Sequence, residues 1–320
     1  MNEIFSLLMH AGSQNPRPDN PGIDIFGFRI YYYAIIIVIG MLVAILIATF
    51  LFKKRGMNPD DLMTYALAAI PFGVLGARLF FFLFPYAGTT SDWSQFFNFR
   101  NGGLAIYGGV IGGAAAAFVV SLLKKQNFFQ VADCCIVGVI IAQSIGRWGN
   151  FVNQEAHGAE ITNPTWQWFP IGVNISGTWY QATFFYESFW NLIGFAFLLV
   201  YSLKWYRRGM PLCIYGLYYG LGRFWIEGLR TDSLFLGNTG IRVSQFVSII
   251  MMLLGLAGAV YIYRKELKRL WYRLLKKPLP EAVQEASGTG TEEEASASDA
   301  TEREQIKTAE EKDGSAEKKE

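Results

Sequence analysis

The chain has 320 residues, of which 52% are hydrophobic, 16% aromatic and only 17% charged. This composition excludes an ordinary soluble domain and is typical of a membrane protein. The formal net charge of +2 favours no particular partner, and we expect no nucleic acid ligand.

Seven apolar stretches are long enough, or nearly so, to cross a hydrocarbon core, which takes roughly 20 helical residues. Because backbone groups in lipid must be satisfied internally, each stretch is predicted to be a helix. The predicted fold class is therefore an all-α polytopic membrane protein. The expected spans are residues 30–52, 64–84, 104–123, 128–146, 182–203, 211–229 and 243–263.

Basic residues in the short connections predict the orientation, because lysine and arginine favour the cytoplasmic side. Lysines and arginines follow the first, third, fifth and seventh spans, which places all four segments on one side. We therefore expect the N-terminus outside and the C-terminus in the cytoplasm. Residues before the first span lack a signal-peptide pattern, so that span is expected to direct insertion.

The opposite side carries arginines and no lysine. Arginine stays charged when desolvated and forms bidentate hydrogen bonds to phosphate, so this pattern indicates a phosphate-bearing ligand near the outer leaflet. For Arg17, Arg29 and Arg100, a role as a helix-end anchor or carboxylate partner is the simpler interpretation. The full set is Arg17, Arg29, Arg78, Arg100, Arg147, Arg223, Arg230 and Arg242.

The sixth span places charge inside the membrane. Arg223 follows Pro211 by 12 residues, which is a rise of roughly 18 Å along a helix. Tyr219, Arg223 and Glu227 recur every four residues and share one helix face. Such a stripe must face protein or water and marks function by default. The alternative is an ion pair that only supports the bundle.

Other spans bring polar residues to the same depth. Tyr107 lies between glycine pairs near the outer end of the third span, where a ligand or a helix could approach closely. "GRWGNFVNQEAHG" at 146–158 continues the fourth span into a predicted loop. The residues expected at one level are Tyr33, Arg78, Tyr107, Arg147, Asn150, Glu155, Glu187, Tyr219, Arg223 and Glu227.

Several chemistries are excluded by the residue types present. The two histidines, His10 and His157, lie outside the spans, and no His/Cys spacing predicts a metal site. No Gly-x-Ser-x-Gly elbow occurs, and the three cysteines are interpreted as packing residues. We expect no metal and no cofactor. The arginines, amides and carboxylates suit the binding of a phosphodiester whose phosphate departs, with the nucleophile supplied by a substrate.

The stretch at 146–158 resembles the G-R-x-G-N-F-x-N-x-E-x-x-G signature of the prolipoprotein diacylglyceryl transferase family at every specified position. "GARLFF", "NGGLAIYGG", "GLGRFWIEGLR" and "RVSQ" are similar to that family in the same order, so the resemblance covers about residues 24–263. It implies transfer of an sn-1,2-diacylglyceryl group from phosphatidylglycerol to the lipobox cysteine of a prolipoprotein. A thioether forms and glycerol phosphate is released, as the first step of lipoprotein maturation in the bacterial cell membrane.

The resemblance also implies site residues. Arg147 and Arg223 would hold the lipid phosphate and stabilise the departing group, and Tyr107 is the third catalytic candidate. Where many members have a proposed histidine base, this chain has Tyr107, so the base for the thiol stays open; activation by the arginine charges is preferred. The expected substrate-binding residues are Tyr33, Arg78, Asn150, Asn153, Glu155, Gly158, Tyr219, Glu227 and Arg230.

Two other functions are weighed against the transferase. A transporter or flippase for an anionic lipid would also use intramembrane arginines, but no inverted repeat is evident. A purely structural scaffold would not need the charged stripe. We expect an extracytoplasmic segment at 1–29, a seven-helix catalytic domain at 30–263, a basic juxtamembrane segment at 264–277 and a disordered cytoplasmic tail at 278–320.

Overall fold

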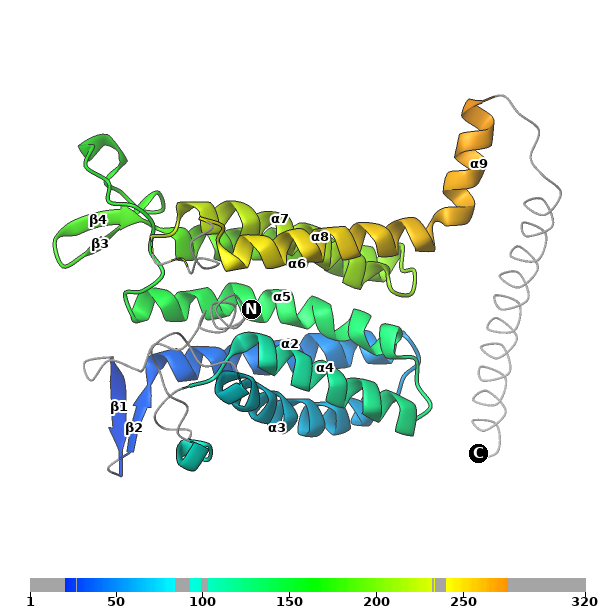
Figure 1. Ribbon diagram of the computed structural model, residues 1–320, viewed down its shortest axis with the longest axis horizontal. Helices are drawn as coiled ribbons and strands as arrows, with labels where there is room; N and C mark the ends of the chain where they lie inside the picture. Colours follow the sequence, from blue (N-terminus) through cyan, green and yellow to red (C-terminus); the bar gives the residue numbers. More distant parts are fainter. Residues whose placement is uncertain are drawn as a thin grey trace, which may run out of the picture. The chain divides into compact units, whose positions relative to one another are not determined.

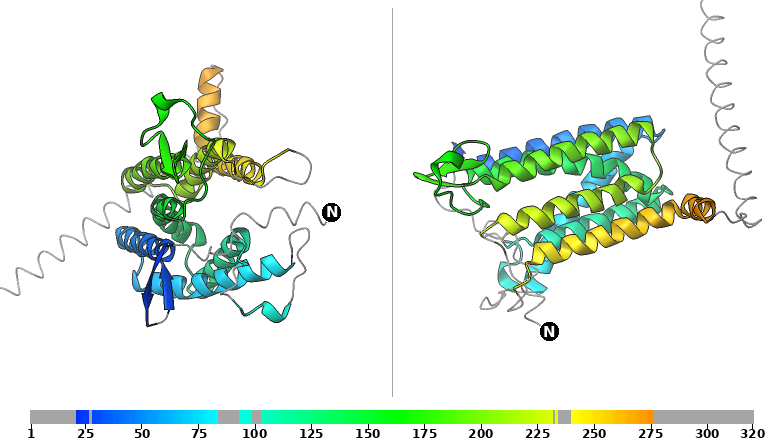
Figure 2. Two further views of the ribbon diagram at one scale, coloured as in Figure 1. Left: turned by 90° about the vertical axis from the view of Figure 1, so that its left-hand side faces the viewer. Right: turned by 90° about the horizontal axis from the view of Figure 1, so that it is seen from above.

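The computed structural model describes residues 21–26, 28–83, 93–98, 103–231, 233 and 240–275. Within this part of the chain, long helices run side by side (Figures 1 and 2), and short connections join α2 to α3, α4 to α5 and α6 to α7. The helices are α2 (Tyr32–Lys54), α3 (Asp60–Leu83), α4 (Ile106–Leu123), α5 (Phe128–Val152), α6 (Thr183–Lys204), α7 (Met210–Leu229), α8 (Val243–Ile262) and the shorter α9 (Arg264–Leu274). Single turns of 3₁₀-helix occur at η1 (Trp93–Gln95) and η3 (Pro164–Trp166).

The predicted spans are found as helices, which confirms the all-α polytopic fold. Six of the described helices, α2 to α6 and α8, are long and apolar enough to cross a membrane. The remaining predicted span, the sixth, is α7, which has the expected bounds within one residue but carries Arg223 and Glu227 in its second half. Its polar residues therefore need protein partners, because lipid offers none.

One helix is longer than the sequence suggests. The fourth span was expected to end at 146, with the polar motif in a loop, but α5 continues to Val152. Arg147 and Asn150 thus project from the last turns of a helix, three residues apart and on the same side. That loop expectation was wrong because glycine and asparagine favour turns in isolation, whereas neighbouring helices stabilise the extra turns here.

Two small antiparallel hairpins were not expected. β1 (Gly22–Ile25) pairs with β2 (Phe28–Tyr31) directly before α2, and β3 (Gly172–Ile175) pairs with β4 (Thr178–Gln181) just before α6. Both lie at the same end of the helices (Figure 1). The β3–β4 turn has positive φ at Ser176 and Gly177, as a tight hairpin turn requires. The basic connections α2–α3, α4–α5 and α6–α7 lie at the opposite end.

Glycines allow close packing between α3 and α4. A Cβ atom added at Gly76 would lie 2.5 Å from the carbonyl oxygen of Gly108 and 3.0 Å from the Cα atom of Gly112. At Gly109 the nearest atoms would be 3.6 Å away, which is an ordinary contact. Backbones that approach this closely gain dispersion and polar contacts that replace the hydrophobic effect inside a bilayer.

Asp133 fixes the start of α7. Its side chain on α5 is fully buried, and its carboxylate accepts hydrogen bonds from the backbone N–H groups of Gly209 at 2.6 Å and Leu212 at 3.2 Å. The Tyr206 hydroxyl donates a third bond at 3.1 Å. A carboxylate at a helix N-terminus satisfies amides that have no helical partner. Asp133 therefore sets the position of the helix that carries Arg223.

Residues 260–320 form a second unit, of which 260–275 are described, and α9 is considered by itself. The predicted tail at 278–320 and most of the predicted segment at 1–29 lie outside the described residues, as do Arg17 and Arg100. The division of the chain into those four segments stays a prediction.

We predict that Gly76→Ala lowers the free energy of unfolding by about 1–3 kcal/mol, because the new methyl group has no space between α3 and α4. Gly109→Ala is the matched control on the same helix pair, and it should leave stability unchanged or slightly raised. Thermal unfolding of the purified protein in detergent measures both. Equal stability of the two variants would contradict the close packing.

Candidate active site

A buried carboxylate links two arginines from different helices. Glu187 lies in the second turn of α6 and is 3% exposed. Its Oε1 atom is 2.6 Å from Nη2 of Arg147 on α5, and its Oε2 atom is 3.1 Å from Nη1 of Arg223 on α7. One negative group thus holds two guanidinium groups in the same small space. The arrangement joins α5, α6 and α7 at the end where the hairpins lie.

Arg223 has partners on two further sides. Its Nη2 atom is 2.5 Å from Oε2 of Glu227, one turn along α7, and donates to Oγ of Ser244 on α8 at 3.2 Å. Glu227 is 2% exposed, and its backbone carbonyl accepts a hydrogen bond from the Arg242 guanidinium. The charged stripe predicted on α7 is therefore embedded in protein, where charge-assisted hydrogen bonds are strongest.

The polar motif after Arg147 forms a chain of hydrogen bonds. Arg147 donates from Nη1 to the side-chain oxygen of Asn150 at 3.3 Å. The amides of Asn150 and Asn153 both donate to Oε1 of Glu155, at 3.1 and 3.3 Å. Gln154 and Ala156 have positive φ. These two conformations reverse the chain, so that Glu155 faces back toward the end of α5.

Short backbone contacts fasten the turn to neighbouring elements. The Thr183 hydroxyl donates to the carbonyl of Ala156 at 2.5 Å. Gly158 donates from its backbone N–H to Gln181 at 3.0 Å and forms an isolated bridge with Arg230 at the end of α7. A side chain at Gly158 would collide with Gln181. The glycine therefore lets the turn approach both β4 and the end of α7.

Three tyrosines surround the arginines. Tyr219 on α7 stacks on Tyr215 with ring centroids 5.2 Å apart, and its hydroxyl lies close to Arg147. Tyr107 on α4 has its hydroxyl near Ser244 and lies within the electrostatic field of Arg223. The ring of Tyr33, at the start of α2, packs on Gly149. Tyr33 also interacts electrostatically with Glu155 and Arg147.

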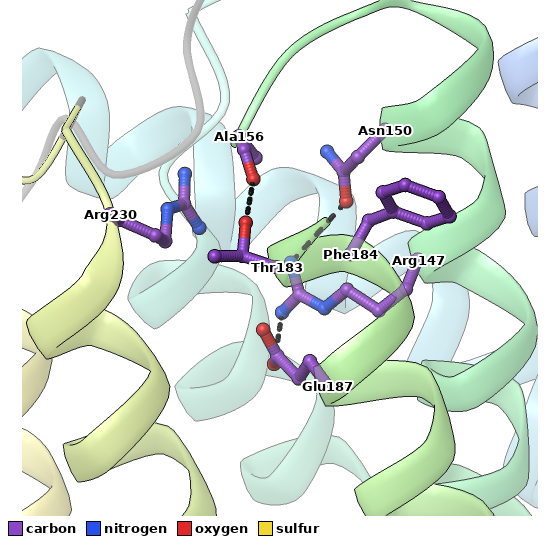
Figure 3. A pocket seen from close by; sticks show the side chains of 7 residues that line it. All are labelled: Arg147, Asn150, Ala156, Thr183, Phe184, Glu187 and Arg230. Carbon is purple, nitrogen blue, oxygen red and sulfur yellow. Dashed lines mark hydrogen bonds and ion pairs between the residues drawn. The ribbon is translucent and has the colours of Figure 1, made fainter. Parts of the chain in front are cut away.

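A small pocket opens beside the ion pairs (Figure 3). Figure 3 shows Arg230 from α7 facing Arg147 and Asn150 across it, with Glu187 beneath. Arg230 also interacts electrostatically with Glu187. The lining residues are Arg147, Asn150, Ala156, Thr183, Phe184, Glu187 and Arg230. Cationic and neutral donors therefore outnumber the single carboxylate, which favours an anionic ligand.

Arg78 has a different environment from the one its depth suggested. Its Nε atom donates to the carbonyl of Phe96 at 2.8 Å, and its Nη2 atom donates to the carbonyls of Gln95 and Asn98 at 2.5 and 2.8 Å. A further bond runs from Nη1 to Gly103 at 3.1 Å. The guanidinium thus fastens the α3–α4 connection by its backbone.

Three residues of the polar cluster, Glu187, Ser244 and Thr183, were given no specific role by the sequence analysis. Glu187 was placed at the right depth, and a carboxylate inside a span signals a cationic partner, but nothing in the sequence indicated that it serves two arginines. Ser244 and Thr183 carry no such signal, because single hydroxyls are common in membrane helices. Among the described residues, no group of three or more His, Cys, Asp and Glu side chains could hold a metal ion.

Comparison with known proteins identifies the family. A sequence model of the prolipoprotein diacylglyceryl transferase family matches residues 22–261. The chain belongs to the prolipoprotein diacylglyceryl transferase family. It is similar to proteins named phosphatidylglycerol–prolipoprotein diacylglyceryl transferase from three bacteria. Identity is 42% for Clostridium kluyveri, covering 75% of this chain and 94% of the relative. For Clostridioides difficile and Streptococcus pneumoniae it is 40% and 39%, covering 77% and 78% of this chain and 96% and 95% of the relatives.

Membership of the prolipoprotein diacylglyceryl transferase family confirms the resemblance stated on the 146–158 motif and makes the chain a multi-pass membrane transferase. The match includes every helix from α2 to α7 and nearly all of α8. It therefore contains the whole polar cluster, from Tyr33 to Ser244. The roles of individual residues within that cluster remain to be argued from their contacts.

For this transferase family member, we predict that Glu187→Gln lowers the free energy of unfolding by about 3–5 kcal/mol, because Arg147 and Arg223 would stay buried without their shared negative partner. Glu160→Gln is the control, since that glutamate is exposed. Thermal unfolding in detergent compares the two. An unchanged midpoint for Glu187→Gln would show that the bridge does not hold the three helices.

Proposed function

We propose that this chain transfers the sn-1,2-diacylglyceryl group of phosphatidylglycerol to the lipobox cysteine thiol of a prolipoprotein. The observation that carries the proposal is the buried cluster in which Arg147 and Arg223 share Glu187, found in a chain of this family. In the reaction, the sulfur atom forms a bond to the glycerol carbon as that carbon's bond to the phosphate oxygen breaks. The electron pair leaves with glycerol phosphate, and the thiol proton passes to the released phosphate, so that atoms and charge balance.

Arg147 and Arg223 hold the lipid phosphate in this proposal. Guanidinium groups stay protonated when desolvated and match two phosphate oxygens at once. The leaving phosphate gains negative charge as the carbon–oxygen bond breaks, so fixed cations stabilise the transition state more than the bound lipid. Glu187 and Glu227 keep both guanidinium groups in place before the lipid arrives.

The pocket residues bind the rest of the head group. Arg230 faces the pocket from the side opposite Arg147 (Figure 3), and Asn150 and Asn153 offer amides that Glu155 orients. Tyr33 and Tyr219 line the approach, and Gly158 lets the turn that carries Glu155 lie against β4 and α7. Arg78 is assigned instead to holding the α3–α4 connection, because its donors point at backbone carbonyls.

Thiol activation relies on the arginine charges. Thiolate is the reactive form, and a positive field favours it. Tyr107 lies within the field of Arg223 and contacts Ser244, so its hydroxyl can donate a hydrogen bond to the sulfur or to the phosphate. In this assignment Tyr107 is a hydrogen-bond donor and does not remove the thiol proton.

The proposed location is the bacterial cytoplasmic membrane, with the site facing the outer leaflet and lipobox signal peptides as the protein substrate. The basic connections lie at the end opposite the site, and the preference of lysine and arginine for the cytoplasm places that end inside. The polar cluster then lies at the level where a prolipoprotein cysteine leaves the membrane.

We predict that Arg147→Gln and Arg223→Gln each lower the rate of transfer by about 10²–10³-fold, because a fixed cation at the leaving phosphate is lost. The assay uses membranes, phosphatidylglycerol and a lipobox peptide, with the thioether product measured by mass spectrometry. Arg208→Gln, an exposed arginine between α6 and α7, is the control and should keep full activity. Lipid movement without thioether product would favour the transporter instead, and full activity of both variants would refute the phosphate assignment.

We predict that Tyr107→Phe lowers kcat by about 10-fold without abolishing transfer, since one neutral hydrogen bond is removed and the arginine field remains. The same peptide assay measures kcat and KM separately. Normal turnover would remove Tyr107 from the chemistry. Complete loss with native stability would instead make Tyr107 the base.

A further inference from the structure

The helix α9 (Arg264–Leu274) has two chemically distinct faces. Spaced at three and four residues, Leu267, Leu270, Trp271 and Leu274 fall within one narrow sector of the helix. All four are exposed, with fractions between 43% and 71%. An exposed apolar stripe of this kind on a short helix needs an occupant, because water covers it at a free-energy cost.

The rest of the helix is strongly basic. The eleven residues hold five arginines and lysines and one glutamate, and Lys276 and Lys277 follow in the sequence. Lys265, Lys268 and Arg269 occupy the sector opposite the apolar stripe. The Arg264 guanidinium lies 4.2 Å from the centroid of the Tyr261 ring, so its stem already packs on an aromatic surface.

We propose that α9 lies in the plane of the membrane surface, with its leucines and Trp271 among the acyl chains and its basic residues on anionic lipid head groups. Amphipathic helices with leucine and tryptophan on one face and lysine and arginine on the other bind interfaces in this way. Each basic residue near an anionic surface adds attraction, and α8 brings the helix to the membrane without a further linker, since only Tyr263 separates the two.

A lipid surface fits the apolar face and the basic face of α9 at once. The acidic C-terminal segment of this chain does not. The acidic stretch 281–320, with 13 aspartates and glutamates against 5 lysines and arginines, offers charge but almost no large apolar side chains. It could contact the basic face only. A bilayer containing anionic lipid supplies the negative surface and the hydrocarbon together.

Hydrogen–deuterium exchange of the full chain tests the proposal. The protein is reconstituted in vesicles of phosphatidylcholine and of phosphatidylcholine with phosphatidylserine, an anionic lipid that is not the donor of the proposed reaction. We expect the amides of 264–274 to exchange at least about tenfold more slowly with phosphatidylserine present. Equal exchange in the two membranes would overturn the proposal.

Variants separate the two faces. Combining Lys265→Glu, Lys268→Glu and Arg269→Glu should abolish the slowing, and so should Leu270→Gln with Leu274→Gln, which keeps the charges. All these replacements are good helix formers. The control, Lys53→Glu with Lys54→Glu at the end of α2, should leave the slowing of α9 intact. If the slower exchange disappears in a chain that ends at Pro280, the acidic stretch covers α9 and the proposal is overturned. If it requires a high protein-to-lipid ratio, a second copy of the chain covers α9, which also overturns the proposal.

Discussion

The structure depends on the burial of one carboxylate between two guanidinium groups. An isolated arginine in an apolar interior is costly, and two arginines side by side also repel each other. Glu187 offsets both effects, because its two oxygens lie 2.6 and 3.1 Å from Arg147 and Arg223. Since the three side chains belong to α5, α6 and α7, the same charges that form the site also fix these helices to one another. Removing the carboxylate would leave two cations with nothing to hold them together, which explains why the site and the packing cannot be separated.

The backbone around this cluster is shaped to bring the polar motif inward. The extra turns of α5 place Arg147 and Asn150 on one side of a helix, and Gly149 leaves room for the Tyr33 ring. Beyond Val152, positive φ at Gln154 and Ala156 returns the chain toward the helix end. The motif is therefore a helix terminus with a fastened turn. That geometry accounts for polar residues directly after an apolar run, because Arg147, Asn150, Asn153 and Glu155 each have a partner within the turn or on α6.

The helices and the two central arginines could be predicted from the sequence, whereas their partners could not. Apolar stretches of sufficient length predict α2 to α8, although α7 is less apolar than the other six. Depth along a helix places Arg147 and Arg223 at one level, because a charge there must face protein. Depth does not give direction around the helix or the identity of partners. Arg78 shows this, since its guanidinium binds carbonyls of the α3–α4 connection, a segment with no periodic signal. The four-residue strands are likewise too short to show the alternation of polar and apolar residues that predicts a strand. The end of α5 was predicted too early because glycine and asparagine favour turns.

The contacts of Arg147 suggest how a phosphate would enter the proposed reaction. Nη2 is held by Glu187 at 2.6 Å, while Nη1 donates to the neutral side-chain oxygen of Asn150 at 3.3 Å. A phosphate that approaches from the pocket can replace the longer neutral bond and leave the ion pair intact, and Asn150 then remains oriented by Glu155. The exchange substitutes a charge-assisted bond for a weak one, so it is favourable while the helices stay where they are. Because Arg223 is already bonded to Glu187, Glu227 and Ser244, in the proposed reaction it would act on the phosphate mainly through its fixed charge as negative charge builds up during departure.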